Sequence, residues 1–91
     1  MAERRYQLRI APSVQRDLRR IVVEYVERIR AAMESLITDP RPTGCKKLKG
    51  RRDLYRVRVG DYRIIYEIED AAELVSIARV MHRSQGYGPG V

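Results

Sequence analysis

The sequence has a single cysteine, no tryptophan or phenylalanine, and no long apolar run. Because Cys45 has no partner in the chain, an internal disulfide is excluded. No stretch approaches the roughly 18 apolar residues of a membrane-spanning helix, and the first residues lack the apolar region of a secretory signal. No cluster of histidine, cysteine and carboxylate residues has metal-ligand spacing, and no glycine-rich strand-to-helix loop predicts nucleotide binding. We therefore expect a cytoplasmic protein that uses no metal or other cofactor.

Basic residues are what the chain has in excess. Lysine and arginine number 19 against 12 acidic residues, a net charge of +7. This balance predicts an acidic partner, either nucleic acid, an acidic protein, or both in turn. A membrane surface is not expected, because the basic run does not fall on an amphipathic helix. Most of the excess lies between positions 46 and 63, in Lys46, Lys47, Lys49, Arg51, Arg52, Arg56, Arg58 and Arg63.

The same segment carries the best strand-turn-strand pattern in the chain. Residues 53–59 and 62–68 alternate as strands, and Gly60-Asp61 between them predicts a two-residue loop in which glycine supplies the positive φ. Counting outward from the loop places Arg58 opposite Arg63, and Tyr55 opposite Tyr66. Since side chains alternate between faces, one face is apolar, with Tyr55, Val57, Val59, Tyr62, Ile64, Tyr66 and Ile68, and the other carries Arg56, Arg58 and Arg63.

Two arginines directly opposite each other are unfavourable for the fold. Like charges in such a pair are destabilising by up to about 1 kcal/mol, so the pair predicts a polyanionic ligand for which the arginines are retained. The alternative is that the arginines only solvate the outer face, with help from Asp53, Asp61 or Glu67.

The remaining segments predict a single small α+β domain over residues 1–91. Residues 5–11 alternate as a strand that ends at Pro12, and 74–81 form a last strand. An apolar stripe at helical spacing covers 13–38, with Ser13 as the N-cap. A single helix of that length would be about 39 Å long, against about 32 Å for a compact domain of this size, so we expect a break near 21–24. The order is strand, two helices and three strands, with the helices packed on one face of a mainly antiparallel sheet.

The hairpin and the C-terminal residues resemble the RelE/ParE superfamily of bacterial toxin-antitoxin toxins, in its RelE branch. The likeness rests on Lys47-Leu48-Lys49-Gly50, on the block from 54 to 66, on His82-Arg83 and on Tyr87. It implies a RelE-like fold and a toxin that enters the ribosomal A site, cuts messenger RNA there, and is held inactive by a cognate antitoxin. Two departures stand out: Met81 replaces a frequent glycine, and arginines replace a functional lysine pair.

The resemblance also implies which residues form the site. Carried over by position, the catalytic set is Arg56, Arg58, Arg63, His82, Arg83 and Tyr87. Lysines and arginines around the hairpin are expected to grip RNA phosphates: Lys46, Lys47, Lys49, Arg51 and Arg52. Arg79 lies on the opposite strand face from His82 by parity, and we expect it to pair with an acid.

Metal-independent RNA cleavage uses the 2′-hydroxyl as an internal nucleophile, and it needs a proton acceptor, a proton donor and cations around phosphorus. Arginine binds phosphate oxygens bidentately but is a poor proton acceptor, so Arg56 and Arg58 can serve electrostatically and not as bases. His82, of a residue type that titrates near neutral pH, and Tyr87 remain for proton transfer. Both have structural alternatives: a solvated histidine at a strand end, and a tyrosine that packs on the sheet or stacks on an RNA base. The ribosome could also supply missing groups.

Two other functions stay open from the sequence. One is that of the gyrase-inhibiting ParE branch, whose members generally lack the basic and aromatic terminus present here. The other is a catalytically idle RNA-binding relative, because the lysine pair is missing.

Overall fold

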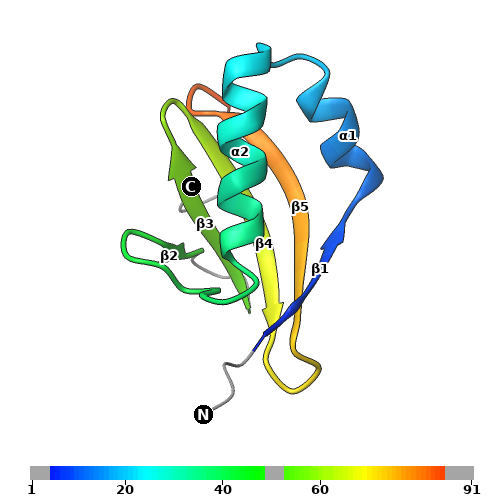
Figure 1. The fold of residues 1–91 in the computed structure, drawn as a ribbon. Coiled ribbons are helices and arrows are strands. Elements are labelled where there is room, and N and C mark those ends of the chain that lie inside the picture. Colours follow the sequence, from blue (N-terminus) through cyan, green and yellow to red (C-terminus); the bar gives the residue numbers. More distant parts are fainter. Residues whose placement is uncertain (1–4, 49–52, 86–91) are drawn as a thin grey trace.

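The computed structural model of the chain describes residues 5–48 and 53–85. Two helices cover one face of a five-stranded mixed sheet (Figure 1). The strands lie in the order β1-β5-β4-β3-β2, with β1 parallel to β5 and every other pair antiparallel. This is the α+β arrangement expected from the sequence. Along the chain the elements are β1 (Gln7–Ile10), α1 (Pro12–Leu18), α2 (Val23–Ser35), β2 (Lys46–Lys47), β3 (Leu54–Val59), β4 (Tyr62–Glu69) and β5 (Leu74–His82).

The helical segment is broken, as predicted, between Leu18 and Val23. Val22 has an extended backbone and acts as the N-cap of α2, in a stretch of β-branched residues with weak helix propensity. The predicted N-cap at Ser13 is wrong. Helix α1 begins at Pro12, since proline suits the first helical position, and the Ser13 hydroxyl instead donates to the Ala78 carbonyl of β5 at 2.8 Å.

The β3–β4 hairpin has the predicted register, with Arg58 opposite Arg63 and Tyr55 opposite Tyr66. Gly60 has φ +57, and a Cβ there would come within 2.6 Å of the Tyr25 ring on α2. Glycine is therefore required at this position both by the backbone conformation and by the close approach of a helix side chain.

The main core lies between the helices and the predicted apolar face of the hairpin. Ile64, Tyr66 and Ile68 are fully buried there, and the other members of that face pack against them half-buried. A second, smaller cluster of Leu48, Ile65 and Met81 lies apart from the main core. Ile65 belongs to the strand face opposite that of Ile64, so the outer face of the sheet is partly apolar, which the sequence analysis did not predict. Neither helix of the described residues is long and apolar enough to cross a membrane.

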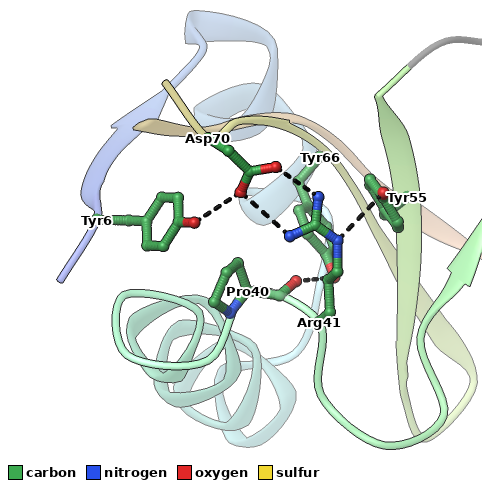
Figure 2. A network of polar contacts seen from close by, with 6 residues as sticks. All are labelled: Tyr6, Pro40, Arg41, Tyr55, Tyr66 and Asp70. Carbon is green, nitrogen blue, oxygen red and sulfur yellow. Dashed lines mark hydrogen bonds and ion pairs between the residues drawn. The ribbon is translucent and has the colours of Figure 1, made fainter. Parts of the chain in front are cut away.

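A polar network fixes the chain after α2 to the sheet (Figure 2). Arg41 makes a bidentate contact with Asp70 and donates to the Tyr55 hydroxyl at 3.2 Å, and Asp70 also accepts from Tyr6 at 2.6 Å. These bonds raise the pKa of Arg41, first through Asp70 and then through Tyr55. The buried Tyr66 hydroxyl donates to the carbonyl of Pro40 at 2.8 Å.

Candidate functional site

The predicted arginines lie together on the open face of the hairpin. Arg58 and Arg63 are direct cross-strand partners, and Arg56, two residues before Arg58, shares their face opposite Ile65. On the other side of β3, Lys46 of the short edge strand β2 pairs with Arg56, so it adds a fourth cation to this face. We call Lys46, Arg56, Arg58 and Arg63 the arginine face.

Arg56 is not an exposed residue of this face, contrary to the sequence prediction, because it keeps only 7% of its surface accessible. The outer sheet surface here is partly covered, as the buried Ile65 directly opposite shows. Burial, and then the charges of Arg58 and Arg63, lower the pKa of Arg56 from its ordinary value. Among the described residues the Nε atoms of Arg56 and Arg63 are buried without a hydrogen-bond partner. Buried N–H donors without an acceptor, close to several positive charges, favour binding of an anion whose oxygens accept hydrogen bonds from them.

A pocket of about 430 Å³ opens at the hairpin end of the arginine face. Arg83, just after β5, borders it and lies across the hairpin loop: its backbone N–H donates to the Asp61 carbonyl at 2.7 Å, and its Nε lies 3.5 Å from the Asp61 carboxylate. The two side chains are 70% and 58% exposed, so this ion pair is weak and the guanidinium stays available to a ligand. The pocket is lined by Arg58, Gly60, Asp61, Tyr62, Arg63, His82, Arg83 and Ser84.

His82 also borders this pocket, but its ring lies on the side of the sheet that the helices cover. It pairs with Tyr62 across the strands and meets the Tyr62 ring edge-on, with centroids 5.3 Å apart. The Nδ1 atom accepts the Ser84 backbone N–H at 3.2 Å and lies 2.9 Å from the Ser84 hydroxyl. Ser84 therefore engages Nδ1, and a ligand in the pocket would meet the Nε2 side of the ring.

The other predicted residues divide between several places. Lys47 pairs with Tyr55 of the apolar face, so strand alternation directs it away from the arginine face. Arg79 binds Asp17 of α1 at 3.0 Å, which confirms its predicted pairing with an acid. Four predicted residues lie outside the described residues: Lys49, Arg51, Arg52 and Tyr87.

Asp61 is a pocket residue that the sequence analysis treated as part of a turn and as a possible counter-charge for the arginines, but not as a site residue. The predicted hairpin already placed it next to Arg63 in the chain, but its closeness to Arg83 depends on how β5 ends beside the loop. No three histidine, cysteine or carboxylate residues within 5–48 and 53–85 are grouped to hold a metal ion.

Known proteins similar to this chain are toxins of toxin-antitoxin systems. Residues 8–87 match the family described as the ParE toxin of the type II toxin-antitoxin system, parDE. The chain is 31% identical to the toxin RelE of Mycobacterium tuberculosis over 87 residues, which cover 90% of this chain and 86% of that protein.

Two solved structures are similar in fold as well as in sequence. One is the archaeal RelE-RelB complex from Pyrococcus horikoshii, with a TM-score of 0.78 and 28% identity over 89% of this chain and 98% of the other. The other is the RelBE2 toxin-antitoxin complex from M. tuberculosis, with a TM-score of 0.76 and 27% identity over 89% of this chain and 94% of the other. The chain therefore belongs to the RelE/ParE superfamily, and it is a type II toxin of the RelE family.

Proposed function

We propose that this toxin is a ribosome-dependent endoribonuclease that cuts messenger RNA in the A site without a metal. The observation that carries the proposal is the meeting of Arg58, Arg63 and Arg83 at one pocket. Their guanidinium groups suit the charge that develops on a phosphodiester as the 2′-hydroxyl attacks it. The directly opposed Arg58 and Arg63 gain most from such an anion, because it offsets the repulsion between like charges on paired strands.

Within this proposal the arginines differ in role. Arg58 and Arg83 are exposed and would contact the scissile phosphate directly. Arg56 is buried beside them and would act through its charge and through its unmet Nε. Tyr87 remains a candidate for base stacking or proton transfer. His82 would contact the RNA through Nε2, since its Nδ1 accepts from Ser84.

The proposed partners are a cognate antitoxin, the ribosome and messenger RNA, in the cytoplasm. The RelE proteins of P. horikoshii and M. tuberculosis were solved in complexes with antitoxins. An antitoxin that covers the arginine face would need acidic or phosphate-like groups to replace the RNA.

Primer extension on a message under translation in a purified system tests the proposal. Wild-type protein is expected to give discrete cuts that depend on ribosomes. Arg58→Ala and Arg83→Ala are each expected to cut at least about 100-fold more slowly, as when a transition-state donor is lost, while both variants stay folded. Arg30→Ala, an exposed arginine of α2, is the matched control and should cut normally. Full cleavage by both site variants would remove the arginine face from the mechanism.

Inhibition of DNA gyrase is the second candidate, because the matching family is described by its ParE toxins. Loss of gyrase supercoiling on addition of the pure protein, with translated messages left intact, would establish this function in place of RNA cleavage. Binding to ribosomes without cuts or gyrase inhibition would indicate a catalytically idle relative.

A further inference from the structure

Among the described residues, the pocket at the hairpin end of the arginine face is lined by one carboxylate, that of Asp61. A lone acid at the border of a strongly basic site weakens the attraction for RNA, so electrostatic binding gives no reason for it. Acids in two-residue loops are common for backbone reasons, but this one is placed beside Arg83 and faces the pocket that Arg58 and Arg63 line.

Cleavage by the 2′-hydroxyl needs a group that accepts its proton, and the arginines cannot serve. Two other titratable side chains of the pocket, Tyr62 and His82, are poorly placed. The Tyr62 ring packs against the core, with its centroid 5.2 Å from that of the Tyr25 ring. The Nδ1 atom of His82 faces the Ser84 N–H and hydroxyl. Asp61 has only one oxygen near a partner in the described part of the chain, since Arg83 lies 3.5 Å from its Oδ1.

We propose that Asp61 is the proton acceptor of the cleavage reaction. The inference rests on the proposed endoribonuclease function and deepens it. The Asp61 carboxylate takes the proton of the 2′-hydroxyl as the 2′-oxygen forms its bond to phosphorus. The bond from phosphorus to the 5′-oxygen breaks, that oxygen leaves with a proton from a separate donor, and the products are a 2′,3′-cyclic phosphate and a 5′-hydroxyl.

Arg83 then has two tasks that its position allows together. Its guanidinium contacts Asp61 Oδ1 and so orients the carboxylate, leaving Oδ2 toward the substrate, and it contributes positive charge to the same pocket. The backbone bond from Arg83 to the Asp61 carbonyl, at 2.7 Å, holds the loop and the end of β5 together. Acceptor and phosphate-binding groups therefore keep a fixed separation.

Asp61→Asn separates this role from the alternatives, because it removes the base and also removes a negative charge. With purified protein and ribosomes carrying a message, we expect the single-turnover cleavage rate to fall by about 100-fold or more. The protein concentration that gives half the maximal rate is expected to stay the same or decrease, because repulsion of the RNA is removed. Asp61→Glu, which keeps the carboxylate, is expected to recover part of the rate.

A message with sulfur in place of the leaving 5′-oxygen provides a second measurement. Such a thiolate departs without a proton, so it restores variants that lack the proton donor and leaves variants that lack the acceptor slow. Asp61→Asn is expected to remain slow on this message. A normal cleavage rate for Asp61→Asn, or its rescue by the sulfur-containing message, would overturn the assignment. The assignment would also be overturned if Asp61→Asn lost folding or affinity for the ribosome-bound message and Asp61→Glu did not recover activity. Failure of the wild-type protein to cut any translated message would instead remove the proposed function itself.

Discussion

Relief of the repulsion between Arg58 and Arg63 is expected to stabilise the fold while it removes the proposed activity. The two residues are direct cross-strand partners, an arrangement that costs a few tenths to about 1 kcal/mol, and the Nε of Arg63 is buried without a partner in the described structure. Threonine suits a strand and removes both effects. We expect Arg58→Thr and Arg63→Thr each to raise the free energy of unfolding by about 0.5–1 kcal/mol.

Thermal and urea unfolding of the two single variants and the double variant measure this repulsion as a double-mutant cycle. For a domain of this size, 1 kcal/mol corresponds to about 4–8 °C in melting temperature. Each single change relieves the same repulsion, so the double variant should gain less than the sum, by up to about 1 kcal/mol. The coupling should shrink in 1 M salt, where the screening length is about 3 Å.

The matched control is Arg9→Thr, an exposed strand arginine whose cross-strand partner is the neutral Ser76. Its stability should change by no more than about 0.5 kcal/mol. Coupling of the opposite sign, with the double variant more stable than the sum of the single changes predicts, would mean that the two arginines are compensated within the free protein. The reasoning that they are retained for an anion would then be refuted.

Three further predictions concern the fold that holds the site. Gly60→Ala should destabilise by more than the roughly 1–2 kcal/mol of a left-handed backbone, and clearly more than Gly44→Ala, which has φ +91 but open space around it; equal losses in urea unfolding would contradict the close helix contact. Tyr66→Phe should lose about 1 kcal/mol at pH 7 with its hydrogen bond. Burial raises the pKa of Tyr66, so its contribution to the free energy of unfolding is fully present below pH 10 and falls by up to about 1.4 kcal/mol per pH unit above pH 10. The difference in the free energy of unfolding between wild type and Tyr66→Phe should therefore narrow above pH 10. A difference that stays constant up to pH 11 would be inconsistent with the raised pKa. Asp17→Ala should cost about 2 kcal/mol in urea unfolding, because it removes the carboxylate that accepts from Arg79 and from the Val80 backbone N–H of β5, and a loss below 1 kcal/mol would show that these bonds are dispensable.

Local chemistry determined the parts of the structure that the sequence predicted correctly. The hairpin register follows from one glycine, a two-residue loop and side-chain alternation, so Arg58 and Arg63 could be paired without coordinates. The break before Val23 follows from the size of the domain. Ser13 was misassigned because a hydroxyl before an apolar stripe suits either a cap or a tertiary bond, and here Ala78 provides the latter.

Long-range packing determined the parts that the sequence did not predict. Strand β2 has two residues and no alternation to detect. The buried Arg56 lies opposite Ile65, which belongs to an apolar cluster on the outer face formed by residues from distant segments. The network of Arg41 and Asp70 joins positions 29 residues apart. The pairing of His82 with Tyr62 follows once the register between β4 and β5 is known. The contact of Arg83 with Asp61 depends in addition on where β5 ends beside the hairpin loop.

The most direct test of the central claim is the structure of the protein on a ribosome whose A-site message carries 2′-O-methyl groups, which block cleavage. The account predicts a message phosphate between Arg58, Arg63 and Arg83. A ribosome-bound toxin with its arginine face turned away from the message, or with these three side chains on different phosphates far from a common bond, would contradict it.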